Sequence, residues 1–230
     1  MKFTVLVDTL VSSAYKRDRV VPAHGLSILV EHSSGMKIMF STGPAFSILV
    51  NNSTELGLVL EGVDVLFIPI WRRPLAGCYE DVITKLKPKL VCTPPRGLSR
   101  GFEHIVKSSS PLKIERYVYS TGIISYGPYV EHAMILTEHN RAFLFIGCAA
   151  YGFSELVQRT KNFPPLRAII GGFHLSTLDI ERFGMLRHLY NSLKVDIVPL
   201  FCTSKEARQK IINMLNKSYD PGVGFVYRYP

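Results

Sequence analysis

The sequence lacks any apolar run of the ~18 residues that a membrane-spanning helix requires. Its longest apolar segment, 63–71, is interrupted by Asp64 and Pro69 and has the length of a strand. The first residues reach Asp8 before a signal-peptide core could form, and no small-residue cleavage site follows. We therefore expect a cytoplasmic protein without a membrane segment.

Cysteine is scarce, and its spacing excludes several kinds of metal site. The four cysteines stand at positions 78, 92, 148 and 202, and no two form a Cys-x-x-Cys pair. This spacing excludes a zinc ribbon and indicates free thiols in a reducing compartment. None of the seven histidines stands within five residues of another, so the sequence holds no local metal-binding cluster.

The overall composition is that of a folded globular protein. Hydrophobic residues make up 47% and charged residues 20% of the 230 residues, which excludes a disordered or low-complexity chain. No repeat or linker divides the sequence, so we expect one domain over residues 1–230. Glutamine occurs only at positions 158 and 209, which is consistent with a thermophile because thermolabile amides are thinned in such proteins.

The protein is basic, with 27 lysines and arginines against 18 acidic residues and a formal net charge of +9. Such a charge permits anionic partners, including nucleic acid. The basic residues are dispersed in small clusters at 16–19, 85–89 and 159–167. This dispersion favours a solvated surface and leaves nucleic-acid binding as an alternative.

Alternating and continuous apolar runs predict an α/β fold with mixed strands. We expect strands at 3–7, 26–31, 36–40, 63–70, 90–92, 117–119, 133–137, 141–146, 168–170 and 196–200. We expect helices at 51–57, 80–86, 154–161, 176–193 and 204–216, the last opened by a capping box of Thr203 and Glu206. The segment 93–115, rich in Gly, Ser and Pro, predicts a long loop.

Five short motifs follow one another in a fixed order along the chain. They are AHGLS at 23–27, FSTG at 40–43, GCAAYG at 147–152, GGFHL at 171–175 and PLFCTS at 199–204, and Glu131-His132 at the start of a strand fits the same pattern. In this order they resemble the metallo-β-lactamase superfamily, and within it the dihydropterin-ribofuranosylaminobenzene-phosphate synthase branch. The resemblance spans roughly residues 2–217. It implies a four-layer αββα sandwich with the site at one edge, between the two sheets.

The positions where the resemblance implies metal ligands carry other residues. The family's His-x-His-x-Asp-His follows a buried strand, and two further histidines come later in the chain. Counted from Asp64 without gaps, the four positions of this motif carry Ile70, Arg72, Pro74 and Leu75. The positions of the two later histidines carry Ala150 and Phe201. Residues 65–79 contain no His, Asp or Glu, so a small shift of register supplies no ligand.

A two-metal hydrolase needs clustered imidazoles and carboxylates, because these bind the divalent ions that activate water. Apolar side chains offer no lone pairs, and Arg72 brings positive charge to the place where a cation would bind. We therefore expect no stoichiometric zinc, iron or manganese, and no cofactor.

Six side chains remain as candidate ligand contacts: His24, Arg72, Arg73, Cys148, His174 and Cys202. The two histidines belong to preserved motifs, although each alternatively fixes its own turn. The two arginines follow the buried strand, where a guanidinium binds phosphate or carboxylate, unless they pair with Glu80 and Asp81 at the surface. The two cysteines align with cysteines of the family, although buried inert thiols are the alternative.

Together these observations predict a non-hydrolytic protein that binds a phosphorylated or carboxylated small molecule, or that acts as a scaffold for a protein partner or a homo-oligomer. One alternative is a hydrolase or synthase of the family with an altered site. Another is a nucleic-acid-binding protein that uses its basic surface. The outcome that competes with an anion pocket is a closed cleft, with Ile70, Leu75 and Phe201 packed together and both arginines outside.

Overall fold

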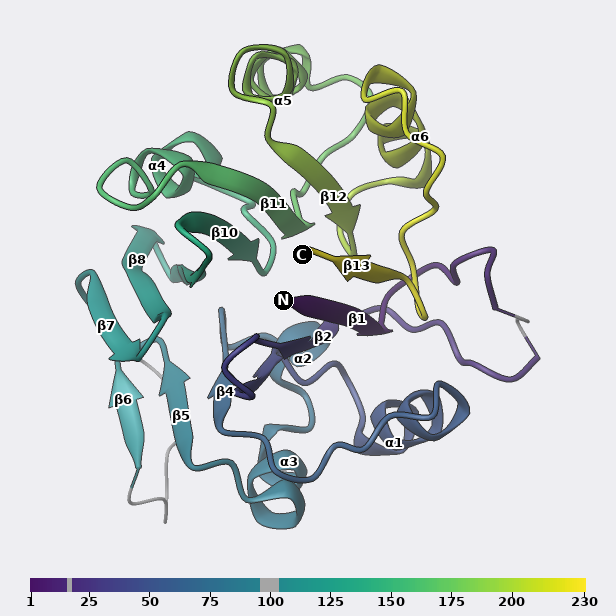
Figure 1. Cartoon of the computed structure of the whole chain (residues 1–230), viewed down its shortest axis with the longest axis vertical. Helices are drawn as coiled ribbons and strands as arrows, with labels where there is room; N and C mark the ends of the chain where they lie inside the picture. Colours follow the sequence, from purple (N-terminus) through teal and green to yellow (C-terminus); the bar gives the residue numbers. More distant parts are fainter. Residues whose placement is uncertain (16–17, 96–103) are drawn as a thin grey trace.

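The strands form two β-sheets that pack face to face, and helices cover the outer face of each sheet (Figure 1). The computed structural model describes residues 1–15, 18–95 and 104–230. The first sheet has the strand order β13-β1-β2-β3-β4-β5-β6, and the second has the order β12-β11-β10-β9-β8-β7. Both sheets are mixed, which confirms the predicted α/β sandwich with helix, sheet, sheet and helix layers.

The first half of the chain supplies most of the first sheet and the helices below it. Its elements are β1 (Lys2–Val7), β2 (Ser27–Glu31), β3 (Lys37–Phe40), α1 (Phe46–Glu55), β4 (Val65–Phe67), α2 (Arg73–Ala76), α3 (Tyr79–Leu86), β5 (Leu90–Thr93) and β6 (Ile105–Lys107). The hairpin expected around Ser33 is β2 paired with β3. From β3 onwards the neighbouring strands run parallel.

The second half forms the second sheet with its helices and then returns to the first sheet. Its elements are β7 (Leu112–Glu115), β8 (Val118–Tyr126), β9 (Tyr129–Glu138), β10 (Arg141–Ile146), α4 (Phe153–Gln158), β11 (Leu166–Gly172), α5 (Ile180–Leu193), β12 (Asp196–Leu200), α6 (Lys205–Met214) and β13 (Val226–Arg228). Strands β10, β11 and β12 are parallel neighbours. The last strand, β13, pairs with β1, so the two ends of the chain lie side by side (Figure 1).

Buried apolar side chains separate into three layers, as the sandwich requires. The central layer joins the inner faces of both sheets, with Phe3 and Phe67 from the first and Phe143 and Phe145 from the second. A second cluster lies between the second sheet and helices α4, α5 and α6. A third lies between the first sheet and helices α1 and α3. Burial of apolar area in these layers is the main source of stability.

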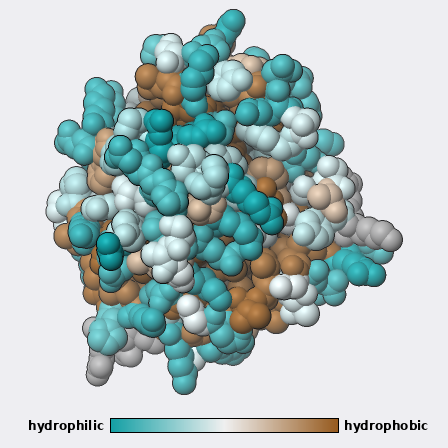
Figure 2. All heavy atoms as spheres, viewed as in Figure 1, coloured by the Kyte–Doolittle hydropathy of each residue, from teal (hydrophilic) through white to brown (hydrophobic). Residues whose placement is uncertain are grey.

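The face drawn in Figure 2 carries many hydrophilic residues, with several hydrophobic areas between them. The basic cluster expected at 16–19 lies partly outside the described residues. Within residues 1–15, 18–95 and 104–230, no helix combines the length and the apolar character that crossing a membrane requires.

The helix expected at 51–57 was misplaced, because α1 begins at Phe46 and ends at Glu55. Asn52 lies inside this helix and is fully buried. The Asn52 amide donates to the carbonyls of Leu6 and Val21 at 2.8 and 2.9 Å, and its oxygen accepts from the Val21 amide at 2.7 Å. These long-range hydrogen bonds make the polar side chain part of the packing.

The long loop expected at 93–115 was also wrong in part. Strands β6 and β7 lie in it, and they form edges of the first and second sheets respectively. Residues 96–103 of that loop lie outside the described residues. Edge strands of three or four residues carry too little periodicity to be distinguished from a loop.

Helices α5 and α6 begin later than expected because their caps lie elsewhere, whereas α4 begins one residue earlier than expected, at Phe153. Helix α5 begins at Ile180, since Asp179 accepts a hydrogen bond from the Arg182 amide at 2.9 Å. Helix α6 is capped by Ser204, which accepts from the Ala207 amide at 3.1 Å. Thr203 therefore forms no capping box. Its hydroxyl instead accepts from the Phe173 amide at 3.1 Å.

His132 of β9 connects the two sheets at the centre of the molecule. Its ring is fully buried and stacks on Phe67, with ring centroids 4.4 Å apart. Nε2 donates to the Ile68 carbonyl at 2.8 Å, and the Ser120 hydroxyl lies 2.8 Å from Nδ1. Because the carbonyl can only accept, Nε2 carries the proton and Nδ1 accepts, so the neutral ring is fully hydrogen-bonded. Burial lowers the pKa of His132 to about 4.

This burial predicts an acid-sensitive fold. In the unfolded chain the histidine binds its proton near its ordinary pKa of 6.5, but in the folded chain only near 4. Its contribution is therefore complete above pH 6.5 and is lost as the pH falls to 4, by roughly 3 kcal/mol. We expect denaturant titrations to show this decline. His132→Gln, which keeps a donor for Ile68, should be less stable at pH 7 and show a shallower decline. If the free energy of unfolding of the two proteins declined in parallel with falling pH, the decline could not be assigned to His132.

Candidate functional site

Three side chains with metal-binding or nucleophilic chemistry meet at one edge of the second sheet. Cys148 follows the end of β10, His174 follows β11 and Cys202 follows β12. These three strands are parallel neighbours, so their carboxyl ends reach the same edge. Ligand sites in α/β folds form in this position. The sheet thus brings together residues that stand 26 and 28 positions apart in the sequence.

The donor atoms of this Cys148–His174–Cys202 group all lie within 4.8 Å of one another. The two Sγ atoms are 3.3 Å apart, and Sγ of Cys148 lies 3.4 Å from Nδ1 of His174. The His174 amide donates to Sγ of Cys202 at 3.2 Å. Cys148 is buried, Cys202 is partly exposed and His174 is exposed, so the group opens to solvent on one side.

The two thiols of the group differ in acidity. The hydrogen bond from Cys202 lowers the pKa of the Cys148 thiol against the opposing effect of burial. Burial, together with the neighbouring Cys148, raises the pKa of Cys202. Burial and the charges of Arg182 and Arg72 lower the pKa of His174 below its ordinary value. At neutral pH the ring is therefore uncharged, and one of its nitrogens has a free lone pair.

Glu131 holds the turn that carries Cys148. Its carboxyl group is fully buried and accepts from the amides of Cys148 at 2.7 Å and Ala149 at 2.9 Å. The Tyr129 hydroxyl donates to the same carboxyl group at 2.5 Å. Burial raises the pKa of Glu131, although these hydrogen bonds oppose the shift. All its described partners are donors, so Glu131 positions the turn.

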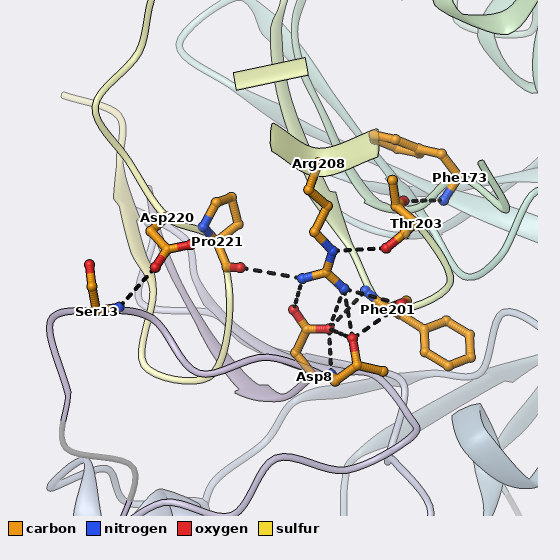
Figure 3. A network of polar contacts seen from close by, with 9 residues as sticks. Asp8, Ser13, Phe173, Phe201, Thr203, Arg208, Asp220 and Pro221 are labelled. Atoms are coloured by element: carbon orange, nitrogen blue, oxygen red, sulfur yellow. Dashed lines mark hydrogen bonds and ion pairs between the residues drawn. The ribbon is translucent and has the colours of Figure 1, made fainter. Parts of the chain in front are cut away.

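The turn that carries Cys202 is held by a buried ion pair from opposite ends of the chain (Figure 3). Arg208 of α6 pairs with Asp8 at 2.6 Å and donates to the carbonyls of Phe201 and Thr203 at 3.1 and 3.0 Å. The Phe201 amide in turn donates to Asp8 at 2.8 Å. The residues on both sides of Cys202 are thereby fixed.

The turns after all three strands contain a residue with a left-handed backbone. The backbone φ angles of Ala149, His174 and Phe201 are 48°, 45° and 49°, which residues other than glycine rarely adopt. Such strain gathers at functional sites because the surrounding structure must maintain it. Here it occurs once after each of the three parallel strands.

Of the six expected contacts, the structure brings three together, Cys148, His174 and Cys202, and places the other three around or away from this group. Arg72 is exposed, with its guanidinium 5.2 Å from the centre of the Tyr129 ring, and its charge acts on His174. His24 is also exposed, and its ring lies 5.2 Å from that of Phe201, beside Cys202. Arg73 begins α2, and within the described residues no contact joins it to the thiols.

The pairing of the two arginines with Glu80 and Asp81 is not found among the described residues. Asp81 pairs with Lys85 at 2.8 Å, and Glu80 accepts from the Tyr79 hydroxyl at 2.8 Å. The alternative of inert thiols at Cys148 and Cys202 stays a prediction. The other two cysteines, Cys78 and Cys92, are buried apart from this group, and burial raises their pKa values.

The apolar residues at the implied ligand positions belong to the central core. Ile70, Leu75 and Phe201 are 2%, 1% and 6% exposed and share one cluster, and Ala150 packs against it. Arg72 and Arg73 lie outside. The apolar positions are therefore packed as the closed-cleft alternative expects, with the exposed Arg72 and the Cys148–His174–Cys202 group at the margin of that packing.

Sequence reasoning missed two parts of the site. Arg182 of α5 donates to the Ala149 carbonyl at 3.0 Å and to the Phe173 carbonyl, so it connects two of the three turns. The Asp8–Arg208 pair spans almost the whole chain. The one signal for this pair in the sequence is Asp8, a charged residue directly after an apolar strand. A charged residue is rarely buried at such a position unless it is paired, so it could have indicated a partner.

No family model matches this sequence, and no curated protein matches it. The solved structures that match nearly all of the chain include the following three. Tm1679, a metal-dependent hydrolase of the beta-lactamase superfamily, has a TM-score of 0.73 at 19% identity, with 100% of this chain and 99% of the other covered. YhfI from Bacillus subtilis, a metallo-beta-lactamase fold protein, has a TM-score of 0.59 at 10% identity, with 99% of each chain covered.

Igni18, a metallo hydrolase from the archaeon Ignicoccus hospitalis KIN4/I, has a TM-score of 0.58 at 14% identity, with 100% of this chain and 99% of the other covered. These identities are too low to transfer an activity, but the likeness extends over the whole sandwich. Together with the two mixed sheets and their outer helices, it shows that the chain has the metallo-β-lactamase fold.

Proposed function

We propose that this protein is a member of the dihydropterin-ribofuranosylaminobenzene-phosphate synthase-like branch that has lost the dinuclear metal centre. In this proposal it binds a phosphorylated or carboxylated small molecule at Arg72 and does not hydrolyse it. The observation that carries the proposal is the exposed Arg72 guanidinium, which lies over the Tyr129 ring while the apolar residues around it in the sequence, Ile70 and Leu75, are buried in the core.

The fold implies a metal centre, since two of the solved structures above are described as metal-dependent or metallo hydrolases. The residues at the implied ligand positions do not fit one. Ile70, Leu75 and Phe201 have no lone pairs, and their side chains fill the core. The guanidinium of Arg72 cannot lose its proton to become a ligand. We therefore derive no hydrolytic step at these positions.

Arg72 is well placed to bind an anion. Its guanidinium lies over the Tyr129 ring, which supports the flat group while its N–H edges stay accessible. Within the described residues Arg72 forms no ion pair that would compete with a ligand. The buried carboxylate of Glu131, which accepts from the hydroxyl of the same Tyr129, has its oxygens occupied by backbone amides and that hydroxyl. A planar guanidinium binds phosphate or carboxylate through two parallel hydrogen bonds.

We expect Arg72→Ala to weaken anion binding at least about tenfold, since a hydrogen bond to a charged group contributes about 1.5–3 kcal/mol. Isothermal titration calorimetry with inorganic phosphate, a nucleoside monophosphate and a dicarboxylate measures this. Arg187→Ala, at an exposed arginine on α5, is the matched control and should leave binding unchanged. Unchanged isotherms in Arg72→Ala, a loss confined to Arg73→Ala, or turnover of an activated phosphodiester would contradict the proposal.

A further inference from the structure

We propose that Cys148, His174 and Cys202 bind a single thiophilic metal ion, with zinc as the expected ion. The ligands are two thiolates and one ring nitrogen, and the fourth position faces solvent. This inference goes beyond anion binding at Arg72, and it departs from the sequence-based expectation of a metal-free protein. It uses none of the positions at which the fold implies a dinuclear centre.

The spacing of the donor atoms fits a tetrahedral ion. With Zn–S near 2.3 Å and Zn–N near 2.0–2.1 Å, neighbouring ligands of a regular tetrahedron lie roughly 3.5–3.8 Å apart. The two sulfur atoms are 3.3 Å apart, and Sγ of Cys148 is 3.4 Å from Nδ1 of His174. A shift of less than about half an ångström brings these two distances to the tetrahedral values. The third pair, His174 and Cys202, has its donor atoms within 4.8 Å of one another, so the exposed imidazole ring has to move toward the ion.

The backbone around the group is built for close approach of sulfur. A Cβ atom added to Gly172 would lie 2.8 Å from Sγ of Cys202, so only glycine leaves room for this thiol. The His174 amide points at the same sulfur atom at 3.2 Å, which stabilises a thiolate there. Glu131 and Arg182 fix the turn of Cys148 from two sides, so the donors are held before an ion arrives.

The charges of the group select the kind of ion. Two thiolates neutralise a divalent ion, which offsets the repulsion from Arg72 and Arg182 nearby. Thiolate ligands favour zinc over magnesium, calcium or manganese, which prefer oxygen ligands. The exposure of His174 provides an entry path and leaves the fourth position open to water or to an anion.

The test uses the full chain without a histidine tag, reduced, incubated with Zn²⁺ or Co²⁺ and then desalted. We expect about one ion per chain by elemental analysis, with Mn²⁺ not retained. The cobalt form should show sulfur-to-cobalt charge-transfer absorption and the visible bands of tetrahedral cobalt. Cys148→Ser and Cys202→Ser should each weaken zinc binding by roughly 100-fold or more.

Cys78→Ser is the matched control, because Cys78 is buried away from the group and a serine hydroxyl can keep its hydrogen bond to the Thr42 carbonyl. Should a buried cysteine variant fail to fold, His174→Ala at an exposed position gives the same test. Cobalt binding without sulfur-to-cobalt absorption would overturn the inference. So would a Cys78→Ser variant that loses as much zinc affinity as Cys148→Ser or Cys202→Ser. So would a Cys148–Cys202 disulfide that persists in reductant and excludes metal. Arg72→Ala should keep its zinc, which separates this result from the test of anion binding.

Discussion

Replacing Arg208 with methionine is expected to lower the free energy of unfolding by about 3–5 kcal/mol, because the change leaves the Asp8 carboxylate buried without its partner. Asp8 and Arg208 are 0% and 2% exposed. Two guanidinium nitrogens reach the two carboxylate oxygens at 2.6 and 2.8 Å. The same guanidinium donates to the Phe201 and Thr203 carbonyls (Figure 3). Methionine fills much of the volume but satisfies none of these acceptors.

Chemical denaturation measures this loss, and Arg187→Met provides the control. Arg187 is exposed on α5, so its replacement should change stability by less than about 0.5 kcal/mol. Combining Arg208→Met with Asp8→Asn should cost less than the sum of the two single changes, since the double variant no longer buries an unpaired charge. A loss below about 1 kcal/mol in Arg208→Met, or strict additivity with Asp8→Asn, would refute the role of this pair.

Gly171→Ala is expected to destabilise the protein by at least about 3 kcal/mol. Gly171 lies in β11 with φ of +128° and pairs with Ile146 of β10. A Cβ atom there would lie 1.9 Å from the Ile146 carbonyl oxygen, which is backbone and cannot rotate away. The two parallel strands that lead to Cys148 and His174 would have to separate.

Gly184→Ala is the matched comparison and should raise stability where Gly171→Ala lowers it. Gly184 lies within α5, and a Cβ atom there meets no atom within 4 Å. Alanine should therefore stabilise the helix by about 0.5–1 kcal/mol, because glycine loses more backbone entropy on folding. Melting temperatures of the two variants provide the readout. If Gly171→Ala were as stable as wild type, the close approach of β10 and β11 would be wrong.

The sequence by itself determined most of the strands and the kind of layering. Runs such as Lys37–Phe40 and Arg141–Ile146 have a local apolar pattern, so they could be recognised without knowing their neighbours. The five ordered motifs pointed to the fold, because they mark the turns at one edge of the sandwich. The sequence also shows Ile70 and Leu75 at positions where the resemblance implies metal ligands, since residue identity needs no structure.

Only the tertiary structure decided which strands lie side by side, and therefore which residues meet. Strand β13 carries little pattern of its own and is defined by its pairing with β1. Cys148, His174 and Cys202 converge because β10, β11 and β12 are parallel neighbours, a non-local fact that spacing along the chain does not contain. Likewise Asp8 and Arg208 are separated by 200 residues, and only folding removes both from water and makes them each other's partner.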